Sequence, residues 1–527
     1  MAPSSSVEGA LMASLDRILR RDLESVVKKA RRVAEAGAGQ ALDQLAVGHH
    51  EPWATLTSEQ RILRNRLRAH GRQLGDRRDD RKGTQEIDRL TGECAYEHWH
   101  RLLFARFLAE NELLVEPESR MALSLDECRE LAQERGIDWL VLASDFAQCM
   151  LPQIFRAGDP VLEVGLPPET RQELEAILEQ LSRDVFIADD SLGWVYQFWQ
   201  AEQKGAINES GNRIGADELA AVTQLFTEDY MVLFLLHNTL GAWWAGKHLA
   251  AHPELATTAT SEEQLRRACG LPGHEWIYLR FVREADGPWR PAAGSYDGWP
   301  NEARALRFLD PCMGSGHFLV FVLPILVAMR ELEEHLSASE AVDAVLRDNL
   351  FGLELDPRCT QLAAFNLAFA AWKLAGHRIL PPLHLACSGL APSMSKAEWV
   401  HLAQKAAQQL PEGPNPELFA NADNLFSQAA KNGMEALYDL FAQAPMLGSL
   451  IDPHRSGGSL IQAGYEELEP VFTAMLAVRG NDEMREAAVA AQGMAKAAQI
   501  LGKRFTLVAT NVPYLGRGRQ SADLQRY

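Results

Sequence analysis

Apolar residues recur every three or four positions along the first 200 residues of this chain. Such spacing predicts amphipathic helices that bury one face. It is found in residues 10–47, 56–74, 90–114, 123–154 and 168–187. The second of these segments opens with Thr57 and Gln60 at the spacing of a capping box. We therefore expect a large helical N-terminal domain over residues 1–200.

A cluster of aromatic residues closes this region at Ser191–Trp199 and is expected in the core. The polar, glycine-containing residues 202–217 predict a linker. Further on, the pattern predicts a helix over residues 229–249 with Trp243 and Trp244 buried. Long helical segments are also expected over residues 320–347, 358–375 and 389–503.

Between these helices, a short apolar run ends at Asp310 and is followed by a glycine turn. Gly314 and Gly316 form the turn, and the strongly apolar residues 317–329 follow it. This order predicts strand, turn and helix, in which backbone N–H groups at the helix start face a ligand. The glycines let the main chain approach that ligand, and Asp310 can accept a hydrogen bond from an ammonium or amide group. A nucleotide-like ligand is expected there, although the same turn occurs in NAD-binding proteins and in turns that bind nothing.

Two later apolar runs also end in polar residues. The run at residues 349–353 leads into Glu354, where a carboxylate suits a pair of ribose hydroxyls. The run at residues 505–510 leads into Asn511, Val512, Pro513 and Tyr514. Strands that alternate with helices in this way predict an α/β fold with a parallel sheet.

The order of these motifs resembles that of the amino-group DNA methyltransferases, which make N6-methyladenine from S-adenosylmethionine. Residues 222–232 and 237–241 resemble the cofactor motif of large phage-defence methyltransferases, the BREX type (PglX) and the related DISARM type (DrmMI). The resemblance implies a class I S-adenosylmethionine-dependent methyltransferase core, which is Rossmann-like. Because the chain stops soon after the catalytic motif, we expect residues 201–527 to be the N-terminal part of that domain, with the core incomplete at the C-terminus.

The resemblance also assigns a role to each motif residue. The expected cofactor contacts are Phe226, Thr227, Asp310, Gly314, Gly316 and Glu354, and the expected catalytic residues are Asn511, Val512, Pro513 and Tyr514. In the family, the asparagine oxygen and the next carbonyl accept the two N6 hydrogens, and the tyrosine stacks on a flipped adenine. A proline normally stands where this chain has Val512, which removes the ring that fixes φ.

Several alternatives remain open at this point. Thr227 could instead cap the following helix, and Ser449 is a further candidate for the adenine pocket. The leading function is methylation of adenine N6 in DNA, which marks host DNA as self. A catalytically inactive DNA-binding or assembly subunit of the same system is favoured by Val512. The third candidate is a protein glutamine methyltransferase, which shares the catalytic motif.

Charge and cysteine content restrict the partners. The formal net charge of −19 is unfavourable for binding DNA, but Arg17–Arg32 and Arg61–Lys82 are basic stretches that could contact phosphates or form solvated helix faces. The seven cysteines are scattered singly, without the spacing of a zinc site or a disulfide framework. We expect no metal, no leader or membrane span, a cytoplasmic location, double-stranded DNA with a flipped adenine as substrate, and other defence subunits as partners.

Overall fold

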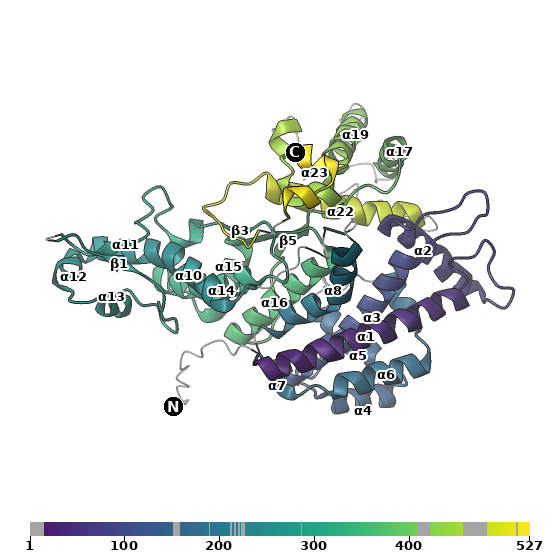
Figure 1. Cartoon of the computed structure of the whole chain (residues 1–527), viewed down its shortest axis with the longest axis horizontal. Helices are drawn as coiled ribbons and strands as arrows, with labels where there is room; N and C mark the ends of the chain where they lie inside the picture. The colour runs from purple at the N-terminus through teal and green to yellow at the C-terminus, as the bar shows by residue number, and fades with distance from the viewer. Residues whose placement is uncertain are drawn as a thin grey trace.

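The computed structural model describes residues 15–526, except 151–158, 189, 211–212, 216–217, 220–221, 223–226, 286, 408–421, 457–481 and 513–514. Figure 1 shows a bundle of N-terminal helices on one side of a central sheet and a smaller lobe on the other. Further helices from the C-terminal half lie above the sheet in that view.

The N-terminal bundle contains the helices that the apolar spacing predicts. They are α1 (Arg17–Gln44), α2 (Ser58–Leu74), α3 (Asp88–Glu110), α4 (Leu125–Arg135), α5 (Trp139–Met150), α6 (Pro168–Glu179), α7 (Arg183–Ile187) and α8 (Ser191–Ser210). The capping box at the start of α2 is present, with Thr57 Oγ1 accepting from the Gln60 amide and the Gln60 side chain accepting from the Thr57 amide. The predicted linker at residues 202–210 is wrong, because α8 continues to Ser210. The first four residues of its second half, Ala201–Lys204, are good helix formers, and Glu202 pairs with Arg32 of α1 at 3.7 Å.

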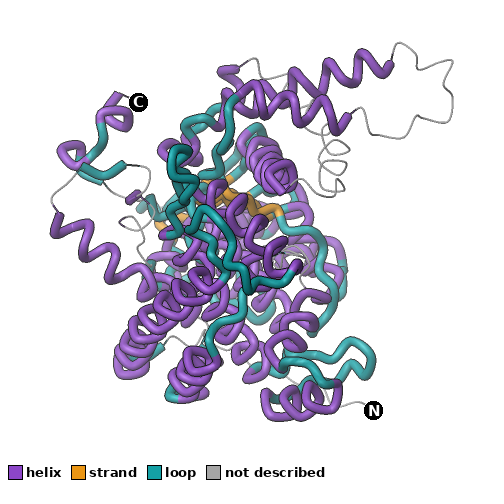
Figure 2. Tube along the Cα trace, turned by 90° about the vertical axis from the view of Figure 1, so that its right-hand side faces the viewer, coloured by secondary structure: helices purple, strands orange, loops and turns teal. Residues whose placement is uncertain are grey.

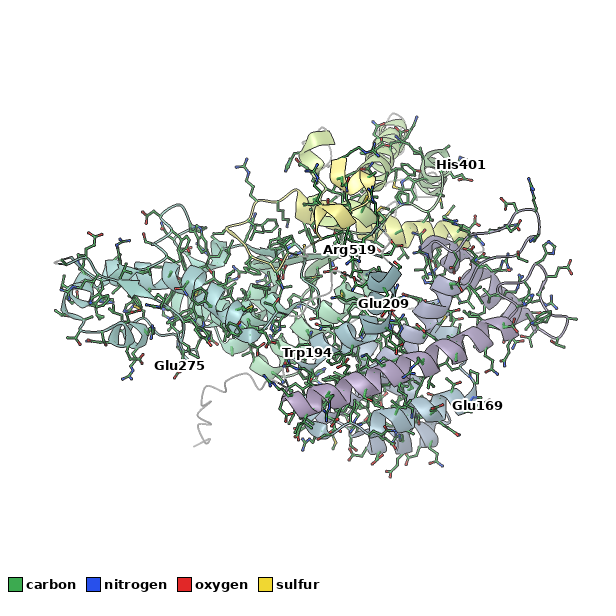
Figure 3. The ribbon with its side chains drawn as sticks, viewed as in Figure 1. Glu169, Trp194, Glu209, Glu275, His401 and Arg519 are labelled. Carbon is green, nitrogen blue, oxygen red and sulfur yellow. The ribbon has the colours of Figure 1, made fainter. Side chains whose placement is uncertain are left out.

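The aromatic segment of α8 is buried as predicted. Tyr196 and Trp199 are each 1% exposed and Trp194 is 7% exposed. In Figure 3, Trp194 lies within the molecule, whereas Glu169 and Glu275 lie at its periphery. The bundle packs on α16 (Pro357–Ala375), where the Phe104 and Phe365 rings stack with centroids 3.9 Å apart.

Along the chain, the lobe comes after the N-terminal bundle and before the first strand of the central sheet. It comprises α10 (Asp229–Leu236), a π-helical turn (His237–Gly241), α11 (Ala242–Ala251), α12 (Pro253–Thr258), α13 (Glu262–Ala268) and the two-residue strands β1 (Phe281–Val282) and β2 (Arg290–Pro291). The predicted helix over residues 229–249 is thus a continuous run with a π turn in its middle. Trp243 and Trp244 are buried, as predicted.

Four parallel strands form the central sheet, which Figure 2 shows enclosed by helices. They are β3 (Phe308–Asp310), β4 (Leu350–Glu354), β5 (His384–Cys387) and β6 (Leu507–Val508), in the spatial order β5-β4-β3-β6. The chain moves outward from β3 through β4 to β5 and then returns to the other side of β3. Strand order therefore reverses between β3 and β6, and ligands of doubly wound sheets bind at the carboxyl ends beside such a reversal.

Side chains of the sheet alternate between two cores. Phe308, Leu350 and Leu385 belong to the core shared with the bundle and with α14 (His317–Glu334), α15 (Ala338–Asp348) and α16. Leu309, Phe351 and Ala386 belong to a second core, under α17 (Lys396–Ala407), α19 (Ala422–Phe441) and α22 (Asp482–Leu501). This alternation gives the three-layered arrangement expected of a parallel sheet that is covered on both faces.

The segment over residues 320–347 contains two helices rather than one. Helix α14 ends at Glu334, and Ser337 forms a capping box with Glu340 that starts α15. None of the described helices is long and apolar enough to cross a bilayer.

Candidate functional site

The glycine turn joins the carboxyl end of β3 to the start of α14. Gly314 and Gly316 both adopt left-handed conformations, with φ of +53° and +82°. A Cβ on Gly314 would meet open space, whereas a Cβ on Gly316 would lie 3.0 Å from the Ala363 Cβ on α16. The two predicted cofactor glycines therefore differ: Gly314 leaves a space beside the main chain, and Gly316 lets the turn pack against α16.

The carboxylate of Asp310 is buried at the start of this turn. The residue is 1% exposed, and its Oδ1 accepts a hydrogen bond from the Cys312 amide at 3.1 Å. Its Oδ2 is also buried and has no hydrogen-bond partner of good geometry among the described residues. Burial raises the pKa of Asp310 to about 7, although the nearby Thr510 hydroxyl opposes this rise. An oxygen placed in this way can accept a hydrogen bond either from the Thr510 hydroxyl or from a donor on a ligand.

Glu354 ends β4 and faces the same turn. Its Oε2 accepts from the Gly314 amide at 2.8 Å, and its Oε1 accepts from the amides of Leu355 at 2.8 Å and Asp356 at 3.1 Å. Burial raises the pKa of Glu354 to about 7, while these amide donors lower it. The predicted ribose-binding carboxylate is thus held directly against the glycine turn.

The residues after β6 bring the predicted catalytic motif to the same edge of the sheet. The Ala509 amide donates to the Leu309 carbonyl at 3.1 Å, which extends the pairing of β6 with β3. Two residues further on, Asn511 Nδ2 donates to Thr227 Oγ1 at 3.1 Å. Val512 is exposed. Phe226, Pro513 and Tyr514 lie outside the described residues.

Thr227 does not cap α10. The N-cap residue is Glu228, and no side chain makes the capping hydrogen bond. The capping alternative for Thr227 is therefore wrong, and its hydroxyl contacts the asparagine of the predicted catalytic motif instead.

After the motif, the chain is anchored on the N-terminal half of the protein. The Ile214 amide donates to the Arg519 carbonyl at 2.8 Å, and Arg519 Nη1 donates to the Asn208 side chain at 2.9 Å. Figure 3 shows Arg519 above Glu209, near the end of α8. The segment that carries Asn511 is thus held by β3 on one side and by the end of α8 on the other.

A small cavity of about 50 Å³ joins some of these groups: its lining includes Thr227, Asp310, Gly314 and Asn511. Glu354 and Gly316 are not among the described residues that line it. Only part of a nucleoside-sized ligand fits between these side chains as they stand.

Three further lining residues of this cavity had no assigned role in the sequence: Tyr196, Gln197 and His317. The Tyr196 hydroxyl donates to the Asp356 carboxylate, and His317 pairs with Asp229 at 3.0 Å. The aromatic spacing of α8 predicted a buried helix but gave no signal that Tyr196 and Gln197 would line a cavity.

Ser449 lies on the other side of the turn, in a 3-10 helix (Gly448–Leu450). Its hydroxyl donates to the Pro311 carbonyl at 2.5 Å and lies 3.2 Å from the Ser388 hydroxyl, which bonds to the Glu354 carbonyl. The sequence candidate for the adenine pocket thus lies close to the ribose carboxylate.

The basic stretch Arg61–Lys82 is largely engaged within the protein. Arg64 and Arg68 are buried and donate to backbone carbonyls, including those of Ala46 and Val47. Arg72 pairs with Glu483 of α22 at 2.7 Å. Several of these cations therefore hold α2 in place and are not available to a phosphate backbone.

Cysteine and metal chemistry find little support in the described part of the chain. Burial raises the pKa of the Cys312 thiol to about 12, so the thiol stays protonated at neutral pH and is a poor nucleophile. No group of three or more His, Cys, Asp or Glu side chains that could hold a metal ion occurs among the described residues.

Comparison with known proteins gives two relatives. The chain is 26% identical over 479 residues to the adenine-specific methyltransferase BrxX of Escherichia coli O9:H4 (strain HS). The aligned region covers 84% of this chain and 37% of that relative. It is also 23% identical over 483 residues to the adenine-specific methyltransferase PglX of Lacticaseibacillus casei (strain Zhang). Here the aligned region covers 83% of this chain and 37% of that relative. No family model matches the chain.

The chain thus spans little more than a third of the length of the curated relatives that it matches. The similarity nevertheless extends over most of this chain rather than over the short motifs alone. The predicted resemblance to the adenine-specific methyltransferases of the BREX type (PglX) is thereby confirmed.

Proposed function

We propose that this chain forms the cofactor-binding and catalytic part of an S-adenosylmethionine-dependent DNA methyltransferase that acts on adenine N6. The contact that carries the proposal is the hydrogen bond between Asn511 and Thr227. It places the asparagine of the catalytic motif in the cavity that Asp310 and Gly314 also line. In a phage-defence system of the BREX type, such methylation would mark host DNA as self, with double-stranded DNA as substrate and other defence subunits as partners.

The sheet supports a class I methyltransferase core. The order β5-β4-β3-β6 matches the first four strands of a doubly wound sheet, and the cavity lies at the carboxyl ends of the strands where the order reverses. A sheet of this class continues beyond β6, and the curated relatives are much longer than this chain. In this proposal residues 1–200 form a helical domain and residues 201–527 form the first part of the methyltransferase domain.

The buried groups fit S-adenosylmethionine. In this proposal Asp310 would hold the ammonium group of the cofactor, because its Oδ2 is buried and makes no hydrogen bond of good geometry with the described residues. Glu354, whose Oε2 accepts from the Gly314 amide, would accept from the ribose hydroxyls, and Gly314 leaves room for the ligand beside the main chain. Phe226 and Thr227 contribute further contacts. When bound, the cofactor supplies a methyl group on a cationic sulfur.

Asn511 prepares the acceptor. Because its Nδ2 donates to Thr227, its Oδ1 is left to accept one N6 hydrogen of the adenine. The carbonyl of Val512 accepts the other hydrogen. These two acceptors localise the N6 lone pair and direct it at the methyl group. Pro513 shapes the loop, and Tyr514 offers a flat surface to an adenine that has left the base stack.

The test is transfer of a tritiated methyl group to DNA by the full-length protein, with Asn511→Ala as the variant. We expect the rate to fall by about 10²–10³, the usual effect of removing one hydrogen-bonding group from a transition state. Cofactor affinity should change less than about threefold, since the Asn511 side chain is placed to bind the adenine rather than the cofactor. Asn65→Ala removes an exposed asparagine of α2 and serves as the matched control.

Two results would contradict the proposal. The first is the absence of labelled N6-methyladenine when the wild-type protein binds the cofactor normally. The second is an Asn511→Ala variant as active as the Asn65→Ala control.

A further inference from the structure

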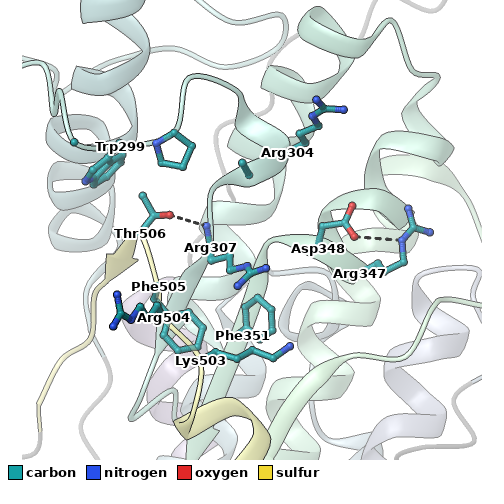
Figure 4. Close-up of a pocket in the computed structure, with 13 residues that line it drawn as sticks. Trp299, Arg304, Arg307, Arg347, Asp348, Phe351, Lys503, Arg504, Phe505 and Thr506 are labelled. Carbon is teal, nitrogen blue, oxygen red and sulfur yellow. Dashed lines mark hydrogen bonds and ion pairs between the residues drawn. The ribbon is translucent and has the colours of Figure 1, made fainter. Parts of the chain in front are cut away.

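A second hollow lies at the opposite edge of the sheet, where the strands begin. Figure 4 shows this groove, which has a volume of about 640 Å³ and is lined by residues 298–300, 304, 305, 307, 347–348, 351 and 503–506. A neighbouring hollow of about 670 Å³ shares Arg307, Lys503 and Arg504 with it. Because the strands are parallel, the amino-end groove and the carboxyl-end cavity are separated by the length of the sheet.

The groove is strongly basic although the chain as a whole is acidic. Five cationic residues line it: Arg304, Arg307, Arg347, Lys503 and Arg504. Asp348 is the one acidic residue in the lining, and it already pairs with Arg330 at 2.9 Å and with Arg347 at 3.3 Å. In a chain with a net charge of −19, this is a local concentration of positive charge.

Internal pairing accounts for only part of this charge. Arg304 pairs with Glu302 at 2.6 Å. The guanidinium groups of Arg307 and Arg504, by contrast, make no hydrogen bond or ion pair with any residue that the structure describes, and both residues are exposed. Their charges are therefore available to a ligand.

Helix ends explain some of the cations but not all of them. Helices α15 and α22 end beside the groove, and their carbonyl ends attract positive charge. Arg347 lies in the last turn of α15, and Lys503 follows α22 closely, with its ammonium 4.9 Å from the centre of the Phe351 ring. Arg307 instead lies between the short 3-10 helix Ala303–Ala305 and β3.

Aromatic surfaces accompany the cations. Phe505 contacts Phe351 with ring centroids 5.3 Å apart, and Trp299 lines the other side of the groove. Guanidinium groups bind phosphates with two parallel hydrogen bonds, and grooves that combine cations with aromatic side chains are typical of proteins that bind nucleic-acid strands. Four of the five cations here are arginines.

We propose that this groove binds the phosphate backbone of a nucleic acid at a site separate from the methyl-transfer cavity. Arg307 and Arg504 contact the phosphates, and Trp299 and Phe505 form the adjoining walls. The inference does not depend on methyl transfer, because the groove and the cavity share no residue. It supplies positive surface that an acidic chain needs in order to hold DNA.

The test measures binding of a 30-base-pair duplex of arbitrary sequence to the full-length protein without cofactor, by fluorescence anisotropy at 50 and 200 mM salt. The variant is Arg307→Gln with Arg504→Gln. Its matched control, Arg183→Gln with Arg267→Gln, also removes two exposed positive charges, but from outside the groove. Each lost phosphate contact lowers the salt slope by about 0.9. Between the two salt concentrations the wild-type protein should therefore lose roughly tenfold more affinity than the groove variant, and the control should behave as wild type.

A second measurement keeps both arginines in place. A photo-crosslinking amino acid at the exposed position Ala305 should attach to the duplex on irradiation, and unlabelled duplex should suppress the product. Equal salt slopes for the groove variant and the control, or no crosslink at Ala305, would overturn the proposal.

The same variants test whether the groove binds a different kind of ligand. If the groove variant loses affinity for ATP or for polyglutamate while its DNA binding is unchanged, the groove takes a free nucleotide or an acidic peptide and the proposal is wrong. Normal methylation by the groove variant, together with unchanged salt slopes, would refute nucleic-acid binding by the groove but not the proposed methyl transfer. Groove binding without methylation would refute the proposed activity alone.

Discussion

Replacing Asp310 by asparagine should stabilise the protein and abolish cofactor binding. The substitution keeps an oxygen that can accept from the Cys312 amide. It also removes a carboxylate whose second oxygen lies buried without a hydrogen-bond partner among the described residues. Asparagine therefore keeps the size of the side chain and one acceptor oxygen, removes the charge, and puts an NH2 donor where Oδ2 stood.

The magnitude follows from the pKa of Asp310. Its ordinary value is 3.8, and burial raises it to about 7 in the folded protein. A folded-state pKa above the unfolded value means that the folded state holds the proton more tightly, so ionisation of Asp310 lowers stability as pH rises from about 4 to about 7. At 1.36 kcal/mol per pKa unit, this loss reaches about 4 kcal/mol at pH 8 and less than half of that at pH 5.

Asp310→Asn should escape this loss. Its advantage in the free energy of unfolding should therefore be roughly 2–3 kcal/mol larger at pH 8 than at pH 5. The assay is urea denaturation of both proteins at the two pH values without cofactor, with calorimetric titration of S-adenosylmethionine in parallel. An advantage that is equal at both pH values would refute the assigned pKa. Normal cofactor affinity in the variant would refute the assigned role of Asp310.

Three further substitutions test the turn and the loop. Gly316→Ala should destabilise the protein by about 2 kcal/mol in urea denaturation, because φ is unfavourable and Ala363 is too close. Gly314→Ala should reduce stability by only about 1 kcal/mol but weaken cofactor binding strongly. If both glycine substitutions had the same effects on stability and on cofactor binding, the assignment of Gly314 to ligand binding and of Gly316 to packing would be wrong. Val512→Pro restores the ring that fixes φ, at a position whose side chain is exposed. The rate of methyl transfer should therefore rise about twofold or more, with little change in stability. A slower variant would show that the loop already has the required shape.

Local sequence signals predicted the helices well where they were strong. Thr57 and Gln60 marked the start of α2, and the apolar spacing located α1 and α16. They failed where a polar segment is stabilised by a distant partner. The second half of α8 resembled a linker because its stabilising contact, with Arg32 of α1, lies far away in sequence.

The predicted cofactor residues came together for a topological reason. Asp310, Glu354 and the segment before Asn511 each follow a strand, and the carboxyl ends of parallel strands share one edge of the sheet. Tyr196 could not be placed by this rule because it reaches the cavity from α8, outside the alternating part of the chain. The roles assigned to these residues remain predictions.

Charge was the property least predictable from sequence. The most basic stretch, Arg61–Lys82, contains arginines that are buried against backbone carbonyls. The basic groove is instead assembled from Arg307, Arg347 and Arg504, which are far apart in sequence and meet because the strands and helix ends converge. Proximity along the chain therefore did not predict proximity on the surface.

The two edges of the sheet have opposite electrostatic character. At the carboxyl edge, Asp310 and Glu354 are both buried with pKa values of about 7, so their charge develops near neutral pH and suits a cationic ligand. At the amino edge, Arg307 and Arg504 are exposed cations that suit an anionic ligand. One sheet therefore presents opposite charge at its two edges, with buried carboxylates at the carboxyl ends of the strands and exposed guanidinium groups at the amino ends.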